Sequence, residues 1–166
     1  MTGYKTAIGG ADTVFPFTSN IKILKATSLN GINGNEQGYS ASNAIDGDTD
    51  TCYLCNSTSG PEIVLTLESE SCIKEVRVLA ARAGSSQSIS SIVTVYGSKD
   101  NVNFKQIASG WCINYIDVNK NNIAFSAIPV NNTEYYRYIK LTKDGEYSGF
   151  YEIEIVGQLK SYLQIM

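Results

Sequence analysis

The chain has 166 residues, enough for one domain with a short arm or tail; 43% of them are hydrophobic and 17% are charged. It contains no histidine, which excludes a Ser-His-Asp triad, a Cys-His pair, a histidine-bound zinc and a histidine general base. The net charge of -3 gives no basic field for a phosphate backbone, so nucleic acid is not expected as a partner.

The two ends of the sequence differ in composition from the part between them. Residues 1–20 are polar and glycine-rich, which predicts an N-terminal arm before a folded domain over residues 21–158, and residues 159–166 form a C-terminal tail. No basic segment followed by an apolar one begins the chain, so no signal peptide is expected. No run of about 18 or more apolar residues occurs, so no transmembrane segment is expected either.

Short stretches of alternating or β-branched residues, typical of β-strands, follow one another along the chain. Turn segments rich in Gly, Asn and Asp separate them, and no segment shows the sustained apolar period of a helix. The expected strands cover residues 21–26, 62–67, 72–80, 92–96, 104–108, 123–128, 135–141 and 151–156. About eight antiparallel strands of this kind predict an all-β fold, a jelly-roll β-sandwich.

The four cysteines, Cys52, Cys55, Cys72 and Cys112, leave more than one interpretation open. Cys52 and Cys55 have the C-x-x-C spacing of half a zinc knuckle, but the other two lie too far apart in sequence to complete one. Small buried thiols are the interpretation we favour.

The segment from Ser42 to Tyr53 carries three aspartates at alternating positions, Asp46, Asp48 and Asp50, with Gly47 between the first two. Closely spaced carboxylates suit a hard cation that takes oxygen ligands, although a solvated acidic turn has the same composition. The EF-hand pattern fails here, because its sixth position lacks glycine and its twelfth lacks glutamate.

Several segments together resemble the discoidin domain, also called the coagulation-factor type C domain, a family that includes the family 32 carbohydrate-binding modules. The resembling segments are AIDG at 44–47, GPEIVLTLES at 60–69, VRVLAAR at 76–82, YGSKDNVNF at 96–104, RYIK at 137–140 and EIEIVG at 152–157. Their order agrees with the family pattern over about residues 21–158. Tyr53 and Phe104 replace tryptophans of that pattern, and Asn101 replaces a glycine. The resemblance implies a galactose-binding-like sandwich.

The resemblance also implies a structural Ca²⁺ where the acidic segment meets the last strand. Carried over to this chain, its ligands are the Asn43 carbonyl, the Asp46 and Asp48 side chains, the Thr51 hydroxyl and carbonyl, the Tyr151 carbonyl and the Glu152 carboxylate. Six or seven oxygens of these kinds suit Ca²⁺ better than Mg²⁺.

In this family, ligands bind to loops at one end of the sandwich, and sugar recognition there needs an aromatic platform and polar groups. The candidate ligand contacts are Arg82, Gln87, Tyr147, Phe150, Tyr39 and Glu36. Two alternatives stay open: Phe150 could instead fill the end of the sandwich, and Arg82 could be a solvated strand terminus. Galactose itself is in doubt, since its binders use a histidine that this chain lacks. Trp111, the sole tryptophan, is assigned to the core, with an exposed anchor as the alternative.

These observations favour a non-catalytic binding module for surface glycans, at an extracellular or particle surface. The alternative is a structural, decoration or host-attachment component of a virion or similar particle, which docks to assembly partners through the sandwich and the N-terminal arm. Lipid binding is a weaker hypothesis, because the loops lack apolar tips ringed by basic residues. Catalysis is not expected, because Glu152, one of the two closely spaced carboxylates Glu152 and Glu154, is assigned to the cation.

Overall fold

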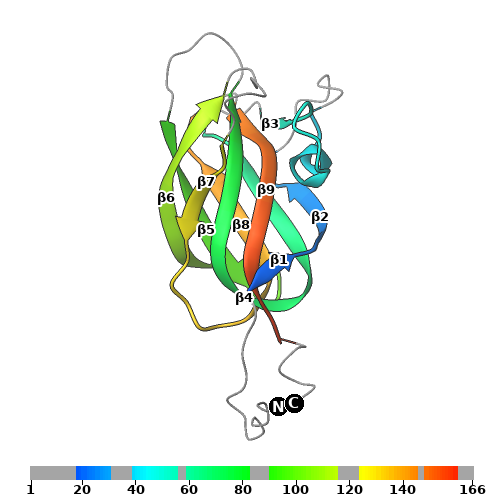
Figure 1. The fold of residues 1–166 in the computed structure, drawn as a ribbon, viewed down its shortest axis with the longest axis vertical. Helices are drawn as coiled ribbons and strands as arrows, with labels where there is room; N and C mark the ends of the chain where they lie inside the picture. Colours follow the sequence, from blue (N-terminus) through cyan, green and yellow to red (C-terminus); the bar gives the residue numbers. More distant parts are fainter. Residues whose placement is uncertain are drawn as a thin grey trace, which may run out of the picture.

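The computed structural model describes residues 18–30, 39–55, 59–82, 90–115, 124–145 and 148–160. The elements within them, in chain order, are β1 (Ser19–Ile21), β2 (Ile23–Ser28), the 3₁₀ helix η3 (Ala41–Ile45), β3 (Tyr53–Cys55), β4 (Glu62–Arg82), β5 (Ser90–Ser98), β6 (Lys105–Tyr115), β7 (Ser126–Pro129), β8 (Tyr136–Lys143) and β9 (Ser148–Leu159) (Figure 1). The predicted all-β sandwich is confirmed. Among these residues no helix is both long and apolar enough to cross a membrane.

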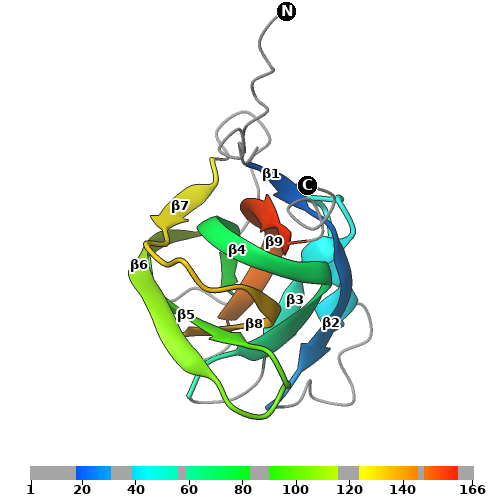
Figure 2. The ribbon, with the colours of Figure 1, turned by 90° about the horizontal axis from the view of Figure 1, so that it is seen from below.

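One long strand, β4, belongs to both layers of the sandwich. Its first part, up to Leu67, pairs antiparallel with β2 and β8, and β5 and β6 extend that layer. Its second part, from Ser71, pairs antiparallel with β9 and β7, and β1 and β3 extend that layer along β9. Seen from one end, the strands surround a common interior (Figure 2). The strands predicted over 62–67 and 72–80 are therefore parts of one strand that bends from layer to layer.

The core lies between the two layers and follows the alternation of the strands. Ile63, Leu65 and Leu67 are completely buried, as their spacing predicts. In the second part of β4, Val76 and Val78 belong to the same core. A register shift between Ile73 and Glu75 marks a β-bulge, and it lets Ile73 reach the core although strict alternation would turn it the other way.

The strand boundaries differ from the predicted ones at β6, which runs on to Tyr115 beyond the predicted 104–108, and where short strands depend on β9. β3 has only three residues and was not predicted; it exists because it pairs with Ser148 to Phe150 of β9. β1 begins at Ser19, inside the predicted arm, and pairs with the other end of β9. Residues 1–17 and 161–166 lie outside the described residues, so the docking role suggested for the N-terminal arm stays a prediction.

All four cysteines are buried and free. In the part of the chain that the structure describes, no group of three or more Cys, Asp or Glu side chains is placed to hold a metal ion. The cysteines therefore occupy buried positions as small core side chains.

The turn between β5 and β6 is organised around Asp100. One carboxylate oxygen of Asp100 accepts hydrogen bonds from the backbone N–H groups of Val102 (2.9 Å) and Asn103 (2.8 Å) and from the Ser98 hydroxyl (3.0 Å). Asn101 within this turn has a φ of 62°, in the left-handed region that non-glycine residues rarely adopt. Asparagine is one of the few side chains tolerated there, which explains how it replaces the glycine of the family pattern.

We expect Asn101→Gly to leave the free energy of unfolding within about 1 kcal/mol of the wild type, since glycine adopts this backbone conformation without strain. Asn101→Val should lower it by about 1–2 kcal/mol, because a β-branched side chain is an outlier at positive φ. Urea unfolding of the two variants measures the difference. Equal stabilities would contradict a left-handed conformation at this position.

Candidate functional site

A pair of carboxylates joins the acidic segment to the last strand. Asp46 follows η3 directly, and Glu152 lies in β9, with only 7% of its surface exposed. The backbone N–H of Gly47 donates to Glu152 Oε1 at 2.7 Å, and the side chains of Glu152 and Asp46 are hydrogen-bonded to each other. The structure thus brings together the two residues on which the predicted cation site depends.

The two carboxyl groups have opposite pKa shifts. Burial raises the pKa of Glu152 to about 7, against the lowering effect of the Gly47 hydrogen bond, and the nearby Asp46 raises it further. Partial burial also opposes the charge on Asp46, but hydrogen bonds from the Asp48 backbone, the Thr51 hydroxyl and Glu152 outweigh it and hold the Asp46 pKa below its usual value. At neutral pH a protonated Glu152 can therefore donate to an ionised Asp46.

Thr51 and Asp48 also bring oxygen atoms next to this pair. The Thr51 hydroxyl lies 2.8 Å from Asp46 Oδ2 and 3.0 Å from the Asp48 carbonyl oxygen. Asp48 Oδ1 accepts instead from the backbone N–H of Asp50 at 2.9 Å. The side chain of Asp48 thus closes its own turn, as aspartates in turns commonly do, and it is the Asp48 carbonyl that lies beside the Thr51 hydroxyl.

Two further predicted ligands flank the pair. Asn43 lies in η3, and its side-chain amide donates to the Cys52 carbonyl at 3.1 Å, which holds the start of the acidic segment to its end. Tyr151 is the extra residue at a register shift in β9, because Leu79 of β4 pairs with Glu152 while Ala80 pairs with Phe150. A bulge of this kind re-aims the backbone next to Glu152.

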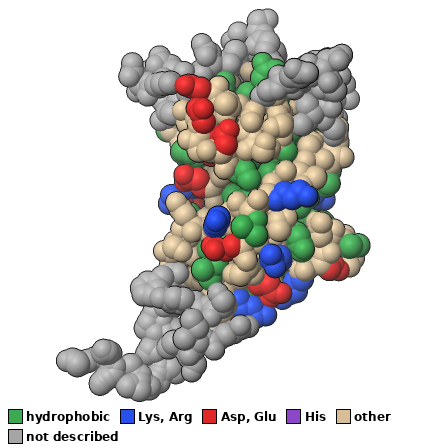
Figure 3. Space-filling model, turned by 90° about the vertical axis from the view of Figure 1, so that its right-hand side faces the viewer, with side chains coloured by type: hydrophobic (Ala, Val, Ile, Leu, Met, Phe, Trp, Pro, Cys, Tyr) green, Lys and Arg blue, Asp and Glu red, His purple; other side chains and the backbone are tan. Residues whose placement is uncertain are grey.

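The oxygens that the hydrogen bonds bring together here belong to two carboxyl groups, the Thr51 hydroxyl and the Asp48 carbonyl, and they are of the kinds that Ca²⁺ takes. Two carboxyl groups forced together in a partly buried place also have a repulsion that a cation would relieve. Figure 3 shows the side of the molecule with β1, β2 and η3, where acidic side chains gather towards one end and Lys and Arg side chains are mixed with acidic ones below. The residues present therefore fit a hard divalent cation.

The segments predicted to carry the ligand-binding loops meet at one end of the sandwich. Asn30 donates to the Gly60 carbonyl, and a Cβ on Gly60 would lie 3.2 Å from the Gly145 carbonyl oxygen. A Cβ on Gly145 would in turn lie 3.2 Å from Arg82 Nη1, and Arg82 pairs with Ser148. We call this end, marked by Asn30, Gly60, Arg82, Gly145 and Ser148, the loop end; it is at the top of Figure 1.

Only some of the predicted ligand contacts fall within the described residues. Arg82 ends β4 at the loop end, and Tyr39 is 40% exposed, with its carbonyl accepting from the Leu54 N–H of β3 at 3.4 Å. Gln87, Tyr147 and Glu36 lie outside the described residues, so their roles stay predictions.

Phe150 is fully buried, so its ring is no exposed stacking platform. It pairs with Tyr53 of β3, which is also fully buried and shares a 2.8 Å hydrogen bond between its hydroxyl and that of Ser28. Both rings belong to the main core. Phe150 thus fills the end of the sandwich, the alternative that the sequence left open, because its position in β9, between β3 and β4, turns its side chain into the core.

Lys143 is a residue of the loop end that the sequence analysis missed. It is 2% exposed; its Nζ donates to the Ala81 carbonyl at 3.3 Å and lies 6.0 Å from the centroid of the Phe150 ring. Burial lowers its pKa to about 8. The alternation that buries Ile139 and Leu141 in β8 places Lys143 on the same inward face. This alternation could have predicted from the sequence that Lys143 is buried.

Trp111 is 66% exposed, so its assignment to the core is wrong. It lies in β6, where Cys112 and Asn114 face inwards and are buried, and alternation therefore turns Trp111 and Ile113 outwards. The predicted strand ended at residue 108 and gave no register for position 111.

The comparisons with known proteins agree with this architecture. The family model for the F5/8 type C domain matches residues 24–154, more than half of the chain, so the chain belongs to this family. No curated protein matches it.

Solved structures share the fold at low sequence identity. A truncated AlyQ with CBM32 and alginate lyase domains has a TM-score of 0.62 at 17% identity over 88% of this chain, which spans 35% of that one. A pectin-binding carbohydrate-binding module has a TM-score of 0.60 at 17% identity over 81% of this chain and 91% of its own. A CBM32 module from Clostridium perfringens, in complex with GalNAc-β-1,3-galactose, has a TM-score of 0.59 at 22% identity over 79% and 93% of the two chains.

Replacing Lys143 tests whether its ammonium group is buried at the loop end. We expect Lys143→Met to raise the free energy of unfolding at pH 7 by about 1–2 kcal/mol, because an apolar chain of similar volume carries no desolvation cost. In the wild type, the depressed folded pKa means that the unfolded chain binds more protons between pH 8 and the ordinary lysine range, so stability should rise with pH there. Chemical denaturation of the variant between pH 7 and 10 should show no such rise in the free energy of unfolding. An unchanged pH profile would contradict the burial of this ammonium group.

Proposed function

We propose that this domain is a non-catalytic module that binds glycans through its loop end. The observation that carries the proposal is that Arg82, the position of a ligand-binding arginine in the family, lies together with the segments around Asn30, Gly145 and Ser148. Membership of the F5/8 type C family and the likeness to carbohydrate-binding modules support the same ligand class.

The chemistry of the loop end suits sugar hydroxyls. A guanidinium group offers several N–H donors in fixed directions, and such buried or half-buried donors discriminate strongly between ligands that do and do not accept them. Tyr39 supplies an exposed ring on the neighbouring segment. Lys143 beneath the surface, in electrostatic contact with Arg82, adds a second positive charge to this end.

The positions of the acidic side chains of β9 support a binding role over a catalytic one. Glu152 is hydrogen-bonded to Gly47 and Asp46, and Glu154 lies 3.7 Å from Arg77 Nη1 in an ion pair. A glycosidase holds its two carboxyl groups about 5–9 Å apart across a sugar, and these two are engaged with other partners.

Arg82→Ala should weaken binding on a glycan array by at least about tenfold, since loss of a charged donor at a ligand site costs more than about 1 kcal/mol. The matched control is Arg77→Ala, an arginine of the same strand that makes a surface ion pair away from the loop end. The control should keep wild-type binding, and both variants should keep the wild-type melting temperature to within a few degrees. A folded wild-type protein that binds no glycan would contradict the proposal.

We further propose that the carboxylate pair forms part of a structural Ca²⁺ site. Asp46, Glu152, the Thr51 hydroxyl and carbonyl, and the carbonyls of Asn43, Asp48 and Tyr151 would hold the ion. Bound there, Ca²⁺ would supply positive charge between two carboxylates and tie the acidic segment to β9. Supporting the proposal are the hydrogen bond between Asp46 and Glu152, the raised pKa of Glu152 and the bulge at Tyr151.

Removal of the cation should lower stability, because a ligand that binds only the folded state stabilises it by about 2.7 kcal/mol at 100 times its Kd. EDTA should therefore lower the melting temperature of the wild-type protein, and added Ca²⁺ should restore it. Asp46→Ala should melt at the lower temperature with or without Ca²⁺.

The matched control for this experiment is Asp50→Ala, an aspartate of the same segment that matches no ligand position. It should keep the Ca²⁺ response of the wild type. A melting temperature that does not respond to EDTA or Ca²⁺ in the wild type would sink the cation proposal and leave the glycan proposal standing.

A further inference from the structure

A group of exposed apolar side chains lies on the outer face of β5 and β6, away from the core. Trp111 is 66% exposed, Ile113 is 53% exposed and Ile92 is 38% exposed. Ile92 and Trp111 are register partners across the β5–β6 ladder, and Ser90 pairs with Ile113. The four side chains thus form two adjacent cross-strand pairs on rigid, hydrogen-bonded strands.

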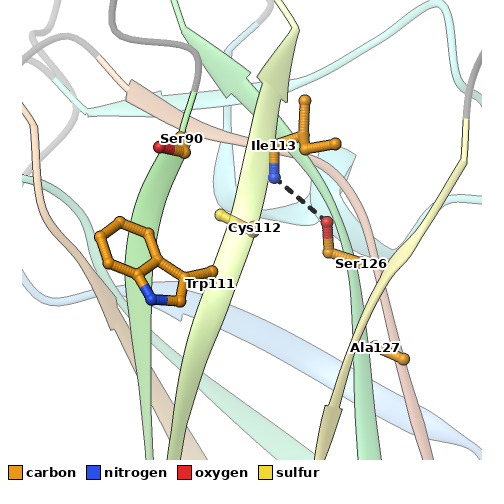
Figure 4. A pocket seen from close by; sticks show the side chains of 6 residues that line it. All are labelled: Ser90, Trp111, Cys112, Ile113, Ser126 and Ala127. Atoms are coloured by element: carbon orange, nitrogen blue, oxygen red, sulfur yellow. Dashed lines mark hydrogen bonds between the residues drawn. The ribbon is translucent and has the colours of Figure 1, made fainter.

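A groove of about 520 Å³ lies on this face and is within the size range of ligand-binding pockets. We call it the Trp111 groove; it is lined by Ser90, Trp111, Cys112, Ile113, Ser126 and Ala127. Figure 4 shows the indole of Trp111 face-on, on the β5 side of β6, with Ile113 and Ser126 on the other side. An indole whose face is presented in this way is the platform that the CH face of a sugar ring packs against.

The strands that form this face carry few charged residues, and beside them Asp144 Oδ1 accepts the backbone N–H of Ile92 at 2.6 Å. β5, β6 and β7 together contain one charged residue, Lys105, which begins β6 at the end remote from Trp111. An anionic lipid surface or an acidic polymer would require basic side chains here, and a charged peptide would require charges of the opposite sign. The groove therefore suits a neutral ligand.

The polar groups of the groove are hydroxyls. Ser126 Oγ accepts the backbone N–H of Ile113 at 3.1 Å, so its own hydrogen is available to donate to a ligand oxygen. Ser90 places a second hydroxyl on the opposite wall (Figure 4). An apolar platform flanked by hydroxyls and no charges matches the alternating CH and OH surface of a neutral sugar.

We propose that the Trp111 groove is a second glycan-binding surface, which takes a neutral pyranose polysaccharide with Trp111 as its stacking platform. The proposal rests on the glycan-binding function proposed above and adds a site distinct from the loop end. Trp111 lies four residues before Tyr115, the end of β6, which is roughly 13 Å at the rise of a strand. A chain of several sugar units held at the loop end can therefore continue down the face of β6 to the indole.

Because Trp111 is the sole tryptophan of the chain, tryptophan fluorescence reports on this groove alone. We would titrate the full chain with neutral galactan, galactomannan and xylan, and with polygalacturonate as a charged comparison, and record tryptophan emission. Stacking should shift the emission to shorter wavelength and protect the indole from acrylamide quenching for at least one neutral polysaccharide. Trp111→Ala should weaken binding of that polysaccharide by at least about tenfold, and Trp111→Tyr should retain part of it.

The control is Val102→Ala, which truncates a 77% exposed apolar side chain in the turn between β5 and β6. It should bind like the wild type, and all three variants should keep the wild-type melting temperature, since neither side chain packs in the core. If Trp111→Ala binds as tightly as the wild type while Arg82→Ala does not bind, the inference is overturned and the loop-end function stands. If no polysaccharide binds, both fail. An emission shift that depends on protein concentration alone, with dimers in sedimentation, would assign the groove to a second copy of the chain and also overturn the inference.

Discussion

The architecture depends on one strand that crosses between two layers. β4 runs through the first layer beside β2 and β8, bends beyond Leu67, and returns through the second layer beside β9. Both of its ends consequently lie at the loop end: the Pro61 carbonyl just before it accepts the Lys143 N–H at 3.2 Å, and the Ala81 carbonyl near its other end accepts Lys143 Nζ. The two layers cannot separate unless β4 gives up its hydrogen bonds to one of them and its inward side chains leave the core. The loop end is therefore built on a rigid base, which is what a binding surface formed by loops requires.

A second constraint is electrostatic and joins elements far apart in the sequence. Asp46 and Glu152 are held against each other by η3, the turn that follows it and the bulge in β9. The opposite shifts of their pKa values, lowered for Asp46 and raised for Glu152, allow the pair to share one proton. If both groups were ionised, the two carboxylates would repel each other, and a bound cation with oxygen ligands would remove that repulsion. Under the proposed Ca²⁺ site, stability of the domain would depend on the ion through these two side chains.

The two candidate binding surfaces differ in their physical character. The loop end carries Arg82 and, beneath it, Lys143, so polar and charged interactions dominate there. The residues of β5, β6 and β7 include one charged side chain, Lys105, and their outer face presents an indole between hydroxyls. The first surface lies where strands end, and the second lies along the hydrogen-bonded strands themselves. A domain built in this way can hold different parts of one extended ligand by different interactions.

The sequence by itself determined the fold class, the family and the core-facing positions of the strand over 62–67, because alternation and short motifs are local patterns that survive in the fold; that Asp46 lies beside Glu152 followed only from the family resemblance. It did not determine that two predicted strands are one, since a strand that changes layers has the same local pattern as two strands. It assigned Trp111 and Phe150 to the wrong environments, because the side on which a residue lies depends on strand length, register and bulges, and these are settled by pairing with distant segments. The burial of Lys143 was likewise decided by the tertiary structure: only the packing of β8 against β4 and β5 removes that position from water.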